Sequence, residues 1–250
     1  MGKRTAKILA PKKGAVFGFD EKIEFRAVAT EETKDGVVDI SEQIQWRKPV
    51  KGMGPTFAMR FKNRDHTTVA IYLNGTQYDS VTPKIVCRAC EIQPPPSVDE
   101  KLLAQIMMAE GIACSAEERR AIGYVVINRV RFLPGYFKKT LEEVIRQKGQ
   151  FHGVSNDIYK WLGSDRSIAE KLNIEQCQRY RETLIIAREI LGDQKSAGER
   201  LFVEEGKHAF YMNRATNDPP DADKSPLLRS KTVSGMRHSF YTSTRYSPKG

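Results

Sequence analysis

Residues 102–130 read LLAQIMMAEGIACSAEERRAIGYVVINRV and hold the strongest evidence on the architecture of the chain. Leu103 and Ile106 share one helical face, and Glu110 extends that face toward the end of the helix. A carboxylate on the apolar side of a helix is costly to bury while charged, which favours its protonated form. Glu110 is therefore a candidate general acid. The alternative is a glutamate that simply ends the helix and reaches solvent or an arginine.

Capping boxes, in which a Ser or Thr is followed three residues later by Glu, indicate where helices begin. With the apolar spacing behind them, they predict helices near residues 98–110, 116–131 and 141–147, and apolar spacing alone predicts a fourth near 174–191. Glu117 and Glu118 lie in the first turn of the second helix, where a carboxylate interacts favourably with the helix dipole. We therefore expect both to act as helix caps.

The first part of the chain, residues 1–86, predicts β-structure. Charged and apolar residues alternate over Lys22–Ala29, and turn signals recur, including the hairpin dipeptide Asn74–Gly75. Short strands separated by turns favour a β-sandwich. Trp46 precedes a Gly-rich turn, an order that resembles bacterial Ig-like modules, in which a tryptophan packs between two sheets. We expect Trp46 in such a core; an exposed tryptophan that stacks on sugars is the alternative.

Residues 87–98, CRACEIQPPPSV, mark a boundary between two domains. Three consecutive prolines favour extended structure and form a semi-rigid linker. Residues 99–250 then combine the predicted helices with short strands expected at 200–203 and 208–212. The predicted fold class is α+β, in which a β-sandwich is followed by a mainly helical domain that carries a small β-element.

The chain has 250 residues and a net charge of +10, with the basic excess spread over both halves. Such a spread favours binding to a polyanionic surface such as the cell wall over sequence-specific recognition of a nucleic acid. No nucleic-acid partner is therefore expected. No apolar run is long enough to span a bilayer, and no membrane span is expected. The first residues lack the continuous apolar segment of a secretory signal peptide, so none is expected either.

Two of the four cysteines, Cys87 and Cys90, have the C-x-x-C spacing of metal and redox sites. We expect a pair of thiols or a local disulfide there, because no second pair of cysteines or histidines at ligand spacing supplies further ligands. A zinc site centred on Cys87 and Cys90 is a weaker alternative. No cofactor and no metal are therefore expected.

Residues 110–130 resemble the core motif of the SleB-like cell wall hydrolases, a family of peptidoglycan-cleaving enzymes. That motif begins with E-A-R-G-E, whose first glutamate matches Glu110, and closes with V-V-L-N-R-V, which matches Val125–Val130. A later G-Q-F element of the family matches Gly149–Phe151. Each piece is weak alone, but their order along the chain makes the resemblance fairly specific.

Two further elements continue the resemblance over roughly residues 98–242. The aromatic strand of the family matches 209–213, and its G-x-x-H-x-F ending matches 235–241. The chain departs from the motif at Ile112 and Cys114, which replace its arginine and its second glutamate.

The resemblance implies a lysozyme-like catalytic domain that cleaves the MurNAc–GlcNAc bond of peptidoglycan glycan strands as a lytic transglycosylase. In this chemistry one glutamate, here Glu110, protonates the bridging oxygen and then removes a proton from the C6 hydroxyl of N-acetylmuramic acid. The resemblance also implies substrate contacts by Gln150, Phe151, Tyr211, Asn213 and His238. For His238, anchoring of the C-terminal segment is the alternative.

Two functional classes therefore stay open. The first is a peptidoglycan-degrading enzyme that reaches the periplasm or cell wall without a signal peptide, as a type VI secretion effector or a phage-type lysin. Its sandwich would then dock to a secretion machine, and an immunity protein could be a partner. The second is a non-catalytic wall-binding or structural component of a secretion or phage machine, which Ile112 and Cys114 favour.

Overall fold

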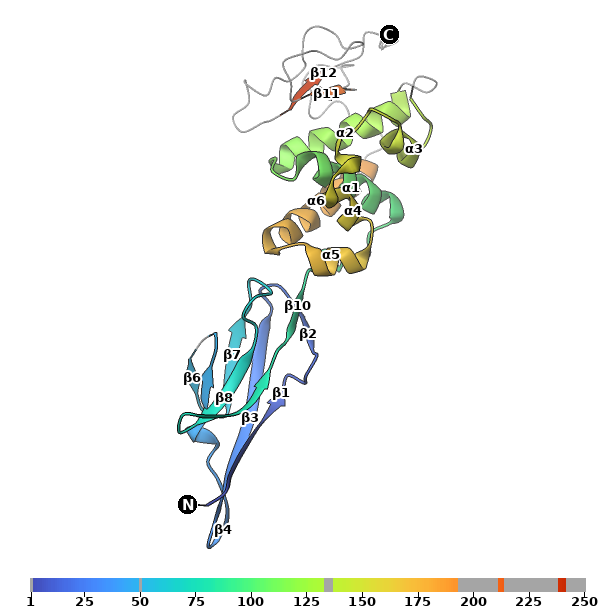
Figure 1. Ribbon diagram of the computed structural model, residues 1–250. Coiled ribbons are helices and arrows are strands. Elements are labelled where there is room, and N and C mark those ends of the chain that lie inside the picture. Colours follow the sequence, from blue (N-terminus) through green and yellow to red (C-terminus); the bar gives the residue numbers. More distant parts are fainter. Residues whose placement is uncertain (1, 50, 133–136, 193–210, 214–237, 242–250) are drawn as a thin grey trace. The chain divides into compact units, whose positions relative to one another are not determined.

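The computed structural model describes residues 2–49, 51–132, 137–192, 211–213 and 238–241 (Figure 1). The chain divides into two compact units, Met1–Arg88 and Ala89–Gly250. Strands come first and helices follow, which agrees with the predicted α+β class. Among the described residues, no helix has both the length and the apolar character needed to cross a membrane.

The described part of the first unit is built from short strands and one 3-10 turn. They are β1 Arg4–Ala10, β2 Val16–Gly18, β3 Lys22–Thr33, β4 Gly36–Asp39, η1 Ser41–Gln43, β5 Gln45–Arg47, β6 Gly52–Met53, β7 Thr56–Arg60, β8 Val69–Leu73, β9 Thr76–Val81 and β10 Lys84–Val86. One antiparallel sheet has the order β1-β3-β4, with β7 also paired to β3, and a second has the order β6-β5-β8-β9. β2 and β10 form a separate parallel pair.

The two larger sheets share one hydrophobic core. Alternate side chains of β3, including Phe25, are buried because successive residues of a strand face opposite sides. Trp46 of β5 is 1% exposed, and its ring lies 6.1 Å from that of Phe25. Its indole N–H donates to the carbonyl of Gly54 at 2.8 Å, which satisfies the polar atom in the core. The prediction that Trp46 is a core residue is confirmed.

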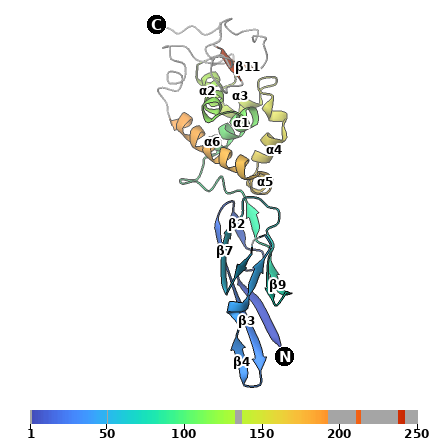
Figure 2. The same ribbon diagram turned by 90° about the vertical axis from the view of Figure 1, so that its left-hand side faces the viewer.

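The described part of the second unit is mainly helical (Figures 1 and 2). Its elements are α1 Val98–Gly111, α2 Ala116–Phe132, α3 Leu141–Arg146, η2 Gly153–Ser155, α4 Asp157–Leu162, α5 Asp165–Lys171, α6 Ile174–Gly192, β11 Tyr211–Asn213 and β12 Ser239–Tyr241. The four predicted helices are confirmed as α1, α2, α3 and α6. The helices α4 and α5 were not predicted. β11 overlaps the strand expected at 208–212, whereas the strand expected at 200–203 lies outside the described residues.

The helices α1, α2 and α6 pack against one another and form the core of this unit. Gly123 of α2 makes the close packing feasible, because a Cβ there would lie 2.6 Å from Ile190 of α6 and 2.9 Å from Met107 of α1. Met107 is fully buried, and Glu110 follows it by about one turn on α1. The packing of the three helices therefore fixes the end of α1 that carries Glu110.

The proline run is bonded to the helices of the second unit. Arg188 of α6 donates to the carbonyl of Pro94 at 2.6 Å, and its Nε forms an ion pair with Glu100 at 3.0 Å. Glu100 also completes the predicted capping box with Ser97 at the start of α1. One arginine thus joins α6, the start of α1 and the segment that precedes it.

The cysteines differ from the expectation. Cys87 and Cys177 are disulfide-bonded, whereas Cys90 and Cys114 carry thiols. A disulfide between Cys87 and Cys90 is therefore wrong, and the zinc hypothesis loses Cys87 as a thiolate ligand. Spacing along the chain could not reveal this, because a disulfide depends on the distance between Cα atoms in the folded protein.

Candidate active site

Glu110 lies in the last turn of α1 and is half-buried. Its Oε1 accepts a hydrogen bond from the backbone N–H of Gly153 at 2.6 Å. The side chain lines a cavity of about 270 Å³. The cavity is lined by Ala109, Glu110, Gln150, His152, Gly153, Asn156, Met212 and His238. The structure therefore brings three of the predicted site residues together: Glu110, Gln150 and His238.

The segment around Gly153 is held close to the end of α1 by backbone and side-chain contacts. Asn156 donates from Nδ2 to the carbonyl of Ala109 at 2.8 Å, while its Oδ1 caps α4 by accepting the N–H of Tyr159. A Cβ on Gly153 would lie only 2.9 Å from the Cβ of Ala109 and 3.0 Å from the N of Glu110. The approach therefore depends on glycine at position 153.

Phe151 is buried behind this segment and is not among the described residues that line the cavity. The guanidinium of Arg129, in the last turn of α2, lies 4.7 Å from the centre of its ring and 5.0 Å from that of Phe137. Two motif elements, N-R-V and G-Q-F, thus meet in one cation–π cluster. Direct contact of Phe151 with a substrate stays a prediction, and its described contacts are those of a packing residue.

His238 is 3% exposed and immediately precedes β12. Its Nδ1 lies 2.7 Å from Oε1 of Glu118, and its backbone N–H donates to the same oxygen at 2.7 Å. The predicted role of Glu118 as a capping carboxylate is wrong. The hydroxyl of Ser115 does accept the N–H of Glu118, but the Glu118 side chain is fully buried and turned to His238.

The remaining predicted contacts, Tyr211 and Asn213, belong to β11. β11 pairs with β12, which begins directly after His238, and Met212 of β11 lines the cavity. The side chains of Tyr211 and Asn213 lie outside the described residues, so their predicted roles stay predictions.

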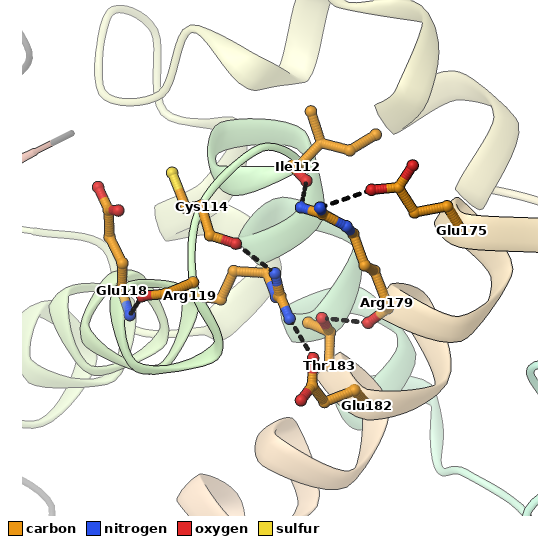
Figure 3. A network of polar contacts seen from close by, with 9 residues as sticks. Ile112, Cys114, Glu118, Arg119, Glu175, Arg179, Glu182 and Thr183 are labelled. Atoms are coloured by element: carbon orange, nitrogen blue, oxygen red, sulfur yellow. Dashed lines mark hydrogen bonds and ion pairs between the residues drawn. The ribbon is translucent and has the colours of Figure 1, made fainter. Parts of the chain in front are cut away.

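A network of arginines fixes the loop between α1 and α2 (Figure 3). Arg119 donates to the carbonyl of Cys114 at 2.6 Å and forms an ion pair with Glu182. Arg179 of α6 donates to the carbonyl of Ile112 at 2.7 Å. The last carbonyls of a helix have no N–H partner within the helix and need other donors. The two arginines supply donors here and hold the chain between Glu110 and Glu118 in place.

Comparisons with known proteins add a family assignment. A search of curated proteins and a search of solved structures return no match. The model of the Cell Wall Hydrolase family matches residues 115–241, just over half of the chain. The matched region includes Glu118, Gln150 and His238 and begins five residues after Glu110. The chain therefore belongs to the cell wall hydrolase family, which supports a role as an enzyme that degrades peptidoglycan.

Proposed function

We propose that the chain cleaves the MurNAc–GlcNAc bond of peptidoglycan as a lytic transglycosylase, with Glu110 as its one catalytic carboxylate. The observation that carries this proposal is that Glu110 lines one cavity together with Gln150 and His238, which belong to the region matched by the cell wall hydrolase family. Among the described residues that line the cavity, Glu110 is the one acidic side chain. A hydrolase of the usual type would require a second carboxylate on the opposite side of the bond.

The proposed reaction needs one proton donor that later acts as a base. Glu110 gives its proton to the bridging oxygen while the bond from that oxygen to C1 of N-acetylmuramic acid breaks. The resulting carboxylate then takes the proton of the C6 hydroxyl, and the C6 oxygen bonds to C1, which closes a 1,6-anhydro ring. The N–H of Gly153 stabilises the carboxylate stage and orients the group between the two steps.

The polar side chains around Glu110 would bind the sugar. We assign Gln150 to the N-acetyl group or a ring hydroxyl, because its amide can both donate and accept and it lines the cavity. Tyr211 and Asn213 keep their predicted roles in stacking and hydrogen bonding. Met212 supplies an apolar part of the lining.

Digestion of purified sacculi by Glu110→Gln tests the proposal. We expect release of soluble muropeptides to fall by at least about 10²-fold, because the amide can neither donate nor accept the catalytic proton. Glu117→Gln is the matched control, since Glu117 is an exposed glutamate in the first turn of α2. Mass spectrometry should find 1,6-anhydro ends in wild-type products. Reducing ends would make the enzyme a hydrolase, and unchanged release by Glu110→Gln would exclude the mechanism.

A non-catalytic wall-binding component is the competing proposal. Ile112 and Cys114 favour it, because they replace two motif residues in the loop that follows Glu110. Binding of wild-type protein to sacculi without any release of muropeptides, over a broad pH range, would support this alternative.

We further propose that the enzyme acts in the periplasm or cell wall of a bacterium, as a secreted effector or a phage-type lysin. The disulfide-bonded Cys87 and Cys177 support this, since disulfides persist in oxidising compartments. In this proposal the first unit is an Ig-like module that docks to a delivery machine. Toxicity on export to the periplasm is expected, and toxicity confined to cytoplasmic expression would contradict it.

A further inference from the structure

Three buried side chains converge beside the cavity, and one of them, His238, is a predicted substrate contact. Cys114, Glu118 and His238 come from the α1–α2 loop, from α2 and from the residue before β12. Their exposed fractions are 3%, 0% and 3%, and their Sγ, carboxylate oxygen and ring nitrogen all lie within 4.8 Å of one another. Figure 3 shows the side chains of Cys114 and Glu118 on the same side of the loop, away from the arginine network. Since His238 also lines the cavity, the cluster borders the candidate active site.

The distances fit a hydrogen-bonded pair better than a metal site. Two ligand atoms on a tetrahedral zinc, each bound at about 2.0 Å, lie roughly 3.3 Å apart. Nδ1 of His238 and Oε1 of Glu118 are 2.7 Å apart, which is the length of a charge-assisted hydrogen bond. The same oxygen also accepts the backbone N–H of His238 at 2.7 Å. Glu118 therefore binds both the ring and the backbone of His238.

The position of Cys114 indicates what this pair replaces. In the resemblance to the SleB-like motif, position 114 is where the second glutamate stands. Here it is a thiol, and Sγ lies 3.9 Å from the same Nδ1 that Glu118 contacts. Glu118 lies four residues later, in the first turn of α2, and its carboxylate reaches the same atom.

We propose that Glu118 has taken over the place of the missing motif glutamate and is the positioning residue for His238. The carboxylate holds the proton on Nδ1 and fixes the orientation of the ring at the cavity. The inference rests on the proposed function where its effect on kcat is measured, because that measurement follows the reaction of Glu110. It removes Cys114 as a reason for regarding the loop as a degenerate, inactive motif, because the carboxylate is relocated and retained.

A relocation experiment tests this inference. Glu118→Ala should lower kcat for muropeptide release by about 10²-fold, as expected when an active-site group is misplaced by about 1 Å, with KM changed much less. Adding Cys114→Glu to Glu118→Ala should restore most of kcat, because the new carboxylate starts from a backbone position already near Nδ1. The matched control is Cys114→Gln with Glu118→Ala, which has the same size and no charge. Equal rescue by Gln and Glu, or no rescue by either in folded protein, would overturn the proposal.

A second measurement separates this inference from the proposed activity. In nitrogen NMR of the imidazole, wild-type protein should show His238 protonated at Nδ1, and Glu118→Ala should alter that signal even if sacculi are never cleaved. An unprotonated Nδ1 in the wild type would overturn the inference. So would stoichiometric zinc in the purified protein that Cys114→Ala removes, because the cluster would then be a metal site.

Discussion

At the scale of single residues, Gly153 determines the orientation of the Glu110 carboxyl group. Its N–H donates to Oε1 of Glu110, and this bond requires the backbone at Gly153 to approach the end of α1 very closely. No residue with a side chain fits there without movement, because the nearest atoms belong to the backbone and the Cβ of Ala109. The orientation of the proposed catalytic carboxyl group is therefore set by a residue with no side chain of its own.

Gly153→Ala should consequently impair the reaction more than the fold. The added Cβ would lie 2.9 Å from Ala109, so the segment must shift and its N–H must move away from Glu110. We expect kcat for muropeptide release to fall by about 10²-fold and stability to fall by roughly 1–3 kcal/mol. Gly192→Ala is the control, since a Cβ at Gly192 meets nothing within 4 Å. Full activity of Gly153→Ala would show that Glu110 does not depend on this hydrogen bond.

The sequence allowed Glu110, Gln150 and His238 to be predicted as site residues, but not Gly153 and Glu118, which bond to two of them. Helical spacing made Glu110 a candidate, and the resemblance to the family motif favoured it over a glutamate that only ends the helix. Its partner Gly153 is 43 residues away, and no local rule connects the two. Glu118 was misassigned because a glutamate in a first helical turn after a serine is typical of a cap. The signal that could have found it was the replacement of the motif glutamate by Cys114, four residues before another glutamate.

At the scale of elements, the ion pair between Arg188 and Glu100 joins α6 to α1. The hydrogen bond from the Arg188 guanidinium lowers the pKa of the Glu100 carboxyl below its ordinary value of 4.5. A lowered pKa in the folded state means that the stabilisation is present above the ordinary pKa. It is lost as pH falls through the lowered value, because both folded and unfolded chains are then protonated.

Glu100→Gln should therefore destabilise the protein only above the acid range. The amide can still complete the capping box with Ser97, so the substitution removes mainly the charge. We expect a loss of about 1 kcal/mol at pH 7 that shrinks as the pH falls below 4.5, measured by urea unfolding at several pH values. Glu142→Gln is the control, because Glu142 pairs with Arg146 on an exposed surface. An equal loss at every pH tested would contradict the assignment to the ion pair.

The helices that could be predicted have either a capping box at their start or, as in α6, enough length to show apolar spacing. α1 and α3 begin at complete capping boxes, which a short stretch of sequence reveals. α4 and α5 begin at Asn156 and Ser164 without a glutamate or glutamine three residues later, and each has only a few residues to form an apolar face. Such short helices depend on the tertiary packing around them, which local patterns do not contain.

At the scale of the whole molecule, the states of the four cysteines favour a disulfide-containing protein over a zinc protein. C-x-x-C spacing suggested that Cys87 and Cys90 act together, but only Cys87 is disulfide-bonded. Burial, with a smaller contribution from the nearby carboxylate of Asp165, raises the pKa of the Cys90 thiol to about 11. Cys90 is thus neutral at physiological pH and is a poor zinc ligand or redox thiol, since both roles require the thiolate.

Determining which cysteines are free in the purified protein tests this arrangement. After denaturation without reductant, alkylation should modify only Cys90 and Cys114, which peptide mapping will show. After prior reduction, Cys87 and Cys177 should be alkylated as well. Reduction should also lower the free energy of unfolding by about 2–5 kcal/mol, because the disulfide no longer restricts the unfolded chain. The control is Cys90→Ser, which should keep the protection of Cys87 and Cys177. Alkylation of Cys87 without reduction would contradict the structure and reopen the zinc alternative.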